Sequence, residues 1–162
     1  MSLKYGALNI AETVMMPVAA DQFFYHEGVN AVFLDGSGHI ELAITATDKL
    51  YGIALPPAGK GQSTSDDYWK SSATAGADEI PVIPVRANAR FLLPADDTVT
   101  AAMKGNACDL VSVNDGTATT VDVGTSSTDV FIIDGLGTDY KHDAAVTDVV
   151  VHLNSDEAQG DT

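Results

Sequence analysis

The segment "AVFLDGSGHIELAI", residues 31–44, most limits the folds open to this chain. Two apolar runs flank the turn Asp35-Gly36-Ser37-Gly38. A Gly-rich turn between apolar runs is typical of a β-hairpin. A third apolar run, Leu50 to Leu55, follows the turn at Thr47-Asp48 and ends at two prolines. The segment 28–55 therefore predicts three strands joined by turns.

A related order of turns and strands returns in residues 105–136. Three marks recur at separations that drift from 77 to 81 residues: Gly105 after Gly28, Asp115-Gly116 after Asp35-Gly36, and Thr128-Asp129 after Thr47-Asp48. Both segments share the order strand–DG–strand–TD–strand, whereas most of their aligned residues differ. Two explanations stay open at this point, a related pair of units and chance similarity among turn-rich β sequences.

Composition favours the same fold class. Of 23 acidic residues, 18 are Asp and 5 are Glu, and Asp prefers turns whereas Glu prefers helices. We predict an all-β fold, a small antiparallel β-barrel or sandwich with a long 56–79 loop and an extended N-terminal segment. Residues 1–26 form that segment, 27–153 a single β domain containing both units, and 154–162 a polar tail.

The net charge of −15 argues against direct binding to nucleic acid or to an anionic membrane, because both would repel the chain. Acidity serves as a solubilising surface or as an adaptation to high salt. No run reaches the roughly 20 apolar residues of a membrane span. Cys108, the single cysteine, lies in the apolar run "NACDLV" and is expected to be a buried small hydrophobe.

No cluster of residues suited to catalysis is visible. The four histidines, His26, His39, His142 and His152, stand singly without metal-ligand spacing. Asp134, Asp139 and Asp143 gather in "DGLGTDYKHD", but their spacing fits no EF-hand, and an ordinary turn is preferred over a calcium site. We expect no enzyme activity, no cofactor and no required metal.

Aromatic residues gather at two places. Phe23, Phe24 and Tyr25 are consecutive, so one strand face cannot bury all three. Tyr68 and Trp69 form a pair within the 56–79 loop. Trp69 must pack on something, either as a flap over its own barrel or against another subunit. These five residues are candidate interface residues.

The run "IPVIPVRANARF" adds the other two candidates. Pro81 and Pro84 cannot donate to a strand ladder, which predicts a strand at a sheet edge or along a surface. Arg86 and Arg90 are the only arginines of the chain. Two uses remain open for them, a local surface ion pair and pairing with acidic groups of a neighbouring copy.

The residues 28–55, with "GVNAVFLDGSGHIELA" and "DKLYGIAL", and more weakly 105–136, resemble the capsid decoration (cement) proteins of tailed phages or archaeal tailed viruses. The resemblance implies a virion protein made in the host cytoplasm and placed on the outer capsid surface. It implies binding to the major capsid protein as a homo-oligomer, with a trimer favoured. Alternatives are a tail or neck component, or a free-standing carbohydrate-binding module that uses Tyr68 and Trp69 as its platform.

Overall fold

The computed structural model describes residues 5–9, 12–45, 48–111 and 119–159. The predicted all-β class is confirmed, because these residues form strands joined by turns and only a single α-helix of four residues, Gly137–Tyr140 (α1). Three 3₁₀ turns lie at Val85–Ala87 (η1), Ala101–Met103 (η2) and Ser155–Glu157 (η3).

The strands are short and are numbered in chain order. They are Gly6–Ala7 (β1), Val14–Pro17 (β2), Phe23–Tyr25 (β3), Asn30–Leu34 (β4), Ile40–Leu42 (β5), Gly52–Ala54 (β6), Tyr68–Lys70 (β7), Glu79–Pro84 (β8), Arg90–Pro94 (β9), Ala107–Leu110 (β10), Val121–Asp122 (β11), Phe131–Leu136 (β12) and Asp148–Leu153 (β13).

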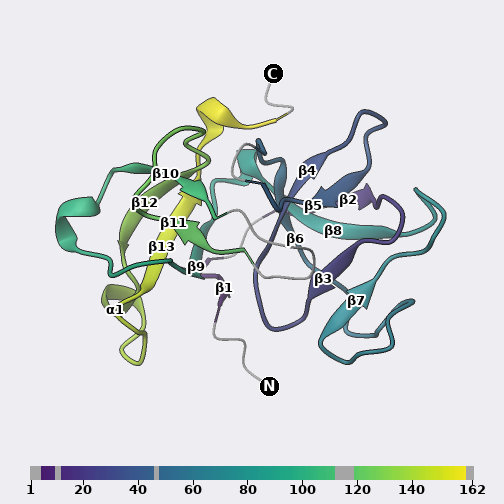
Figure 1. Ribbon diagram of the computed structural model, residues 1–162, viewed down its shortest axis with the longest axis horizontal. Coiled ribbons are helices and arrows are strands. Elements are labelled where there is room, and N and C mark those ends of the chain that lie inside the picture. Colours follow the sequence, from purple (N-terminus) through teal and green to yellow (C-terminus); the bar gives the residue numbers. More distant parts are fainter. Residues whose placement is uncertain (1–4, 10–11, 46–47, 112–118, 160–162) are drawn as a thin grey trace.

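Two antiparallel sheets make two lobes that lie side by side (Figure 1). One sheet has the order β2-β8-β6-β4-β5, and the other has the order β1-β9-β13-β12-β10-β11. A separate two-stranded ribbon of β3 and β7 belongs to the first lobe.

The two sheets are copies of one five-strand arrangement. Taken in chain order, β2, β4, β5, β6 and β8 occupy the same sheet positions as β9, β10, β11, β12 and β13, and β1 is an addition beside β9. In chain order, the hairpin units at 28–55 and 105–136 supply the second, third and fourth strands of each copy. The first and last strands of each copy in chain order, β2 and β8 or β9 and β13, come from segments that the sequence rhythm did not include.

Each copy is curled by the same parallel bridge. Val18, just after β2, bridges Ile40 of β5, and Ala95, just after β9, bridges Val121 of β11. The next residue extends each bridge, since the Ala19 amide donates to the Ile40 carbonyl at 3.0 Å and the Asp96 amide donates to the Val121 carbonyl at 2.9 Å. The bridge at Val18 closes the first sheet into a small barrel, and the second sheet curls in the same way.

The turn of the first hairpin is held by its aspartate. The Asp35 carboxylate accepts from the backbone N–H of His39 at 2.9 Å and of Ser37 at 2.7 Å. The hydrogen bond from the His39 backbone is the main cause that lowers the pKa of Asp35, and the bond from Ser37 adds to it. The corresponding Asp115-Gly116 turn lies outside the described residues.

Side chains fill both barrels. The inner cluster of the first copy includes Val32, Ile40 and Val82. The cluster of the second copy includes Cys108, Val121 and Val151 and extends to the junction with the first lobe. Because these filled interiors leave no wide lumen, each copy is a packed core and not a channel.

One expectation about the prolines was wrong. The strand β8 does not lie at a sheet edge, because it pairs with β2 on one side and with β6 on the other. Pro84 faces Gly52, the first residue of β6, and the Pro81 carbonyl accepts from Leu55 just past its last residue. The prolines therefore stand at the two ends of the β6–β8 ladder, where a missing N–H costs least.

The expected long loop at 56–79 also needs correction. Its residues 68–70 form β7, which pairs with β3 of the N-terminal segment. The remainder of the loop folds back on this strand, since Gly61 bridges Lys70 and the Lys70 amide donates to the Lys60 carbonyl at 3.0 Å. The N-terminal segment itself contributes β1, β2 and β3 to the sheets.

Hydrogen bonds of Thr119 and Gln159 tie the lobes together. Thr119 accepts the Ala31 amide through its hydroxyl at 2.8 Å and donates its own amide to Val29 at 2.9 Å. Gln159 in the polar tail accepts from the Leu34 amide at 2.6 Å and donates to the Leu34 carbonyl at 2.8 Å. A residue just before β11 of the second copy and a residue of the tail therefore hold β4 of the first copy.

Equivalent registers predict that Cys108 can be replaced by valine. Val32 faces Gly52, and Cys108 faces Phe131, at the same position of each copy. Cys108 is fully buried, as expected, and burial raises the pKa of its thiol to about 12. We expect Cys108→Val to change the free energy of unfolding by less than about 1.5 kcal/mol in urea denaturation.

The reciprocal variant Val32→Cys serves as the matched control and should be similarly mild. A loss above about 3 kcal/mol for Cys108→Val, with Val32→Cys mild, would show that the two interiors are not equivalent.

Candidate functional site

The ribbon of β3 and β7 brings five of the seven candidate residues together. Phe24 faces Trp69 across the ribbon, and Tyr25 faces Tyr68. Phe23 faces Lys70. Since side chains alternate along a strand, the ribbon has an inner face of Phe24 and Trp69 and an outer face made by the other four.

The inner face is part of the core. Phe24 is 0% exposed and Trp69 is 6% exposed, and both belong to the inner cluster of the first copy. Their rings stack with centroids 6.0 Å apart at 21°. Trp69 is thus a flap over its own barrel, and it cannot belong to the exposed platform that the carbohydrate-binding alternative required, because the indole is buried.

The outer face is aromatic and half-exposed. The hydroxyls of Tyr25 and Tyr68 share a hydrogen bond of 3.0 Å, and the two ring centroids lie 4.5 Å apart. This hydrogen bond is the main cause that raises the pKa of Tyr25, because it stabilises the neutral hydroxyl. Phe23 meets Tyr68 edge-on at 6.0 Å, and the Lys70 ammonium lies 5.2 Å from the Phe23 ring centroid. We name Phe23, Tyr25, Tyr68 and Lys70 the outer ribbon face.

Buried polar side chains fix the ribbon in place. Asn30 accepts the Tyr25 amide at 2.8 Å and donates to its carbonyl at 2.9 Å. Ser71 accepts the Gln22 amide and donates to the Ala19 carbonyl, both at 2.8 Å. Sequence reasoning missed both residues. The only sequence signal for each was a polar residue in a segment that otherwise reads as a strand (Asn30) or as a turn (Ser71).

The two arginines lie away from the outer ribbon face and make local ion pairs. The Arg86 guanidinium is 3.0 Å from Glu12, and that of Arg90 is 3.7 Å from Asp134. Arg90 is on β9 of the second copy. The seven candidate residues therefore form one cluster of five and two separate surface positions.

Two of the three acidic residues considered for calcium have other contacts. Asp134 lies 3.0 Å from the His152 imidazole, and Asp139 lies 3.3 Å from the Lys104 ammonium. In the ranges that the structure describes, no group of three or more His, Cys, Asp or Glu side chains is arranged to hold a metal ion.

Comparisons with protein-family models, with curated protein sequences and with solved structures give no match for this chain. Among the described residues, no helix has the length and apolar character needed to cross a membrane. Geometry and charge are therefore the grounds on which a function is proposed.

The stacked pair predicts a stability difference between neighbouring residues. Trp69→Ala should lower the free energy of unfolding by about 3–5 kcal/mol, because it leaves a cavity where the indole packs into the first barrel. Tyr68→Ala, one residue away on the outer face, should cost only about 1 kcal/mol. Urea denaturation of both variants measures the difference. Equal losses would mean that the ribbon does not plug the barrel.

Proposed function

We propose that this chain is a virion structural protein that decorates the outer capsid surface and bridges major capsid protein subunits. The observation that carries the proposal is the outer ribbon face. It offers three half-exposed aromatic rings on a ribbon that is held rigidly by the buried Phe24–Trp69 stack. Aromatic residues on a rigid support lose little conformational entropy on binding, which makes them effective anchors of protein interfaces.

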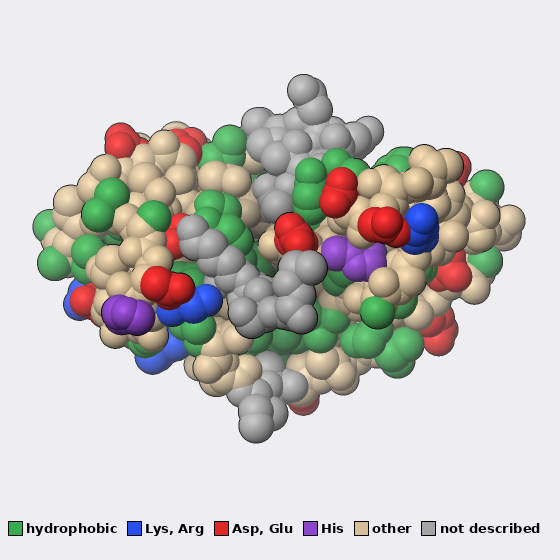
Figure 2. All heavy atoms as spheres, turned by 90° about the horizontal axis from the view of Figure 1, so that it is seen from below, with side chains coloured by type: hydrophobic (Ala, Val, Ile, Leu, Met, Phe, Trp, Pro, Cys, Tyr) green, Lys and Arg blue, Asp and Glu red, His purple; other side chains and the backbone are tan. Residues whose placement is uncertain are grey.

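The charge distribution supports a protein partner. Acidic side chains are spread over both lobes on the face seen in Figure 2, where basic side chains are few. Such a surface repels nucleic acid and keeps a densely decorated particle soluble. In the outer ribbon face, Lys70 is held by Asp21 at 2.9 Å, so contact with a partner there is mainly apolar and aromatic.

The packed architecture also supports a mechanical role. Two filled barrels joined by Thr119 and Gln159 form a unit with little internal freedom. Repeated over a shell, many modest interfaces of such units add up to a large stabilisation. We propose a homo-oligomer, with the trimer favoured, as the form that meets the capsid.

Binding to capsids tests the proposal. We expect the double variant Tyr25→Ser/Tyr68→Ser to lose at least tenfold in affinity for purified capsids of the source virus, measured by cosedimentation, because it removes two aromatic anchors. Val146→Ser is the matched control, since Val146 is 63% exposed on the other lobe, and it should bind normally. Wild-type protein that binds no capsid, or that mass spectrometry finds in purified tails only, would exclude the decoration role.

A carbohydrate-binding module remains the second candidate function. Its proposed binding site is the outer ribbon face and no longer includes Trp69. The Tyr25–Tyr68 pair favours it, since two tyrosines joined through their hydroxyls present both ring area and polar groups, as sugar rings require. On this hypothesis, a glycan array shows saturable binding that Tyr68→Ala abolishes and Trp69→Phe retains. Absence of any glycan binding by the wild type would exclude this second candidate.

A further inference from the structure

One half of the outer ribbon face already holds a cation between an aromatic ring and a carboxylate. The Lys70 ammonium lies 5.2 Å from the Phe23 ring centroid and 2.9 Å from the Asp21 carboxylate. A cation over an aromatic ring is attracted by the negative face of the ring, and a neighbouring carboxylate adds an ion pair. This half therefore needs no further cation from outside.

The other half has the aromatic rings and the carboxylate but lacks the cation. The rings of Tyr25 and Tyr68 are half-exposed, and Asp67, which precedes Tyr68 in the chain, is exposed. Among the described residues, no Lys or Arg lies over either tyrosine ring, and Asp67 makes no ion pair. The Tyr25–Tyr68 half thus offers a place for a positive charge that the chain itself does not fill.

Asp67 is fixed beside the tyrosine pair by neutral hydrogen bonds. Its carboxylate accepts from the Ser65 hydroxyl at 3.3 Å, and its backbone carbonyl accepts from the His26 amide at 3.0 Å. The hydrogen bond with Tyr68 is the main cause that raises the pKa of Tyr25, and the negative charge of Asp67 adds to the rise. The charge of Asp67 therefore acts on the pair, and these hydrogen bonds leave it uncompensated.

We infer that the Tyr25–Tyr68 half of the outer ribbon face receives an arginine side chain of a protein partner, whose guanidinium stacks on a tyrosine ring and pairs with Asp67. Arginine fits because its planar, weakly hydrated guanidinium both stacks on aromatic rings and pairs with carboxylates, which the ammonium of lysine does less well. A basic partner also complements a chain of net charge −15. The inference rests on the proposed function, since it names the chemistry of the partner surface that the outer ribbon face meets.

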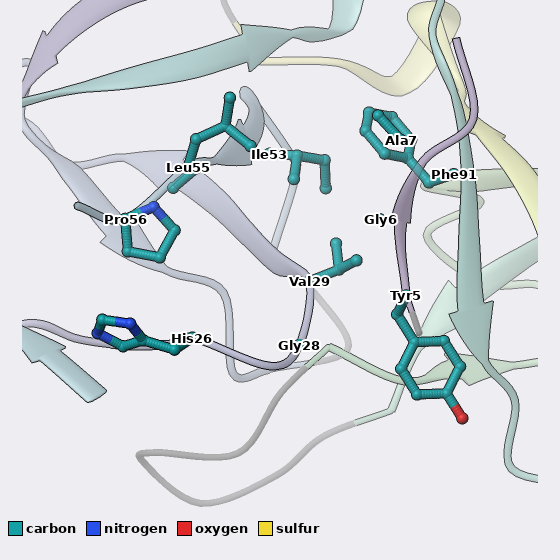
Figure 3. A pocket seen from close by; sticks show the side chains of 11 residues that line it. Tyr5, Gly6, Ala7, His26, Gly28, Val29, Ile53, Leu55, Pro56 and Phe91 are labelled. Atoms are coloured by element: carbon teal, nitrogen blue, oxygen red, sulfur yellow. The ribbon is translucent and has the colours of Figure 1, made fainter. Parts of the chain in front are cut away.

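The pocket between the two lobes does not compete for this cation (Figure 3). It has a volume of about 290 Å³ and is lined mainly by apolar residues, among them Val29, Ile53 and Phe91. None of the described residues that line it carries a carboxylate, and the ring nitrogens of His26 turn away from the other lining side chains. A cation in the pocket would lose its hydration without gaining a partner.

NMR titration of the full chain with N-acetyl-glycyl-arginyl-glycinamide tests the inference. We expect saturable shifts of the ring signals of Tyr25 and Tyr68 at low ionic strength, where salt screens the ion pair least. The same peptide with citrulline in place of arginine keeps the planar group but loses the charge, and it should bind about tenfold more weakly. The lysine peptide keeps the charge but loses the plane, and it should bind about threefold more weakly.

Two neighbouring aspartates provide matched variants. Asp67→Asn should weaken binding of the arginine peptide about threefold, because it removes the unpaired carboxylate. Asp66→Asn removes the same charge one residue away, but Asp66 is already paired with Lys60 at 3.0 Å, so its affinity should stay within about twofold of the wild type. Both residues are exposed, and thermal melting verifies that both variants are folded.

Three outcomes would overturn the inference: no saturable shift of the two tyrosines, an arginine peptide that binds no more tightly than either control peptide, or equal losses in Asp67→Asn and Asp66→Asn. Capsid cosedimentation separates the inference from the proposed function. Wild-type protein that binds the arginine peptide at the two tyrosines but binds no capsid would contradict the decoration role and support the inference. Capsid binding by a wild type whose tyrosines do not respond to the peptide would do the reverse.

Discussion

The structure depends on how the first strand of each copy crosses to the far side of its own sheet. Val18 meets Ile40, and Ala95 meets Val121, by the same parallel bridge. In both cases a proline, Pro17 or Pro94, ends the strand immediately before the bridge. Val18 and Ala95 still donate to the first neighbour, to the carbonyls of Asp78 at 2.9 Å and Thr147 at 2.7 Å, whereas the next residues, Ala19 and Asp96, donate to the far strand, to Ile40 at 3.0 Å and Val121 at 2.9 Å. The chain therefore passes from one neighbour to the other within two residues of a proline, whose fixed angle φ restricts the backbone there.

The shared five-strand order explains the architecture, and the segments between its strands explain the candidate site. In the first copy, β3 stands between β2 and β4, and β7 stands between β6 and β8. In the second copy, η2 and α1 occupy those two places in the chain. The outer ribbon face is thus built from the two insertions of the first copy, on a barrel that both copies share. On this view, the function lies in β3 and β7, the two segments that interrupt the shared strand order.

Buried polar groups are rare in the interior, and their bonds hold the insertions and loops. The Asp109 carboxylate accepts from the amides of Ser127, Thr128 and Asp129 at 2.8–3.0 Å. Burial acts to raise the pKa of Asp109, but these backbone N–H groups outweigh it, so the pKa lies below its usual value. Asn30 does the same work for the ribbon through its amide. Among the described residues, the Nε2 of His26 is the exception, because it is buried and has no hydrogen-bond partner.

By itself, the sequence determined the properties that depend on near neighbours. Strand alternation and the turn at Asp35 predicted the all-β class and the first hairpin, and the apolar run around Cys108 predicted its burial. Tertiary structure alone decided which strands pair across long separations. It placed β8 inside a sheet despite Pro81, and it buried Trp69 while leaving Tyr68 outside. The physical reason is that the local sequence gives only a residue's conformational preference. The free-energy cost of a proline in a strand depends on where the neighbouring strand ends, and the free energy gained by burying a tryptophan depends on whether a barrel lies beneath it.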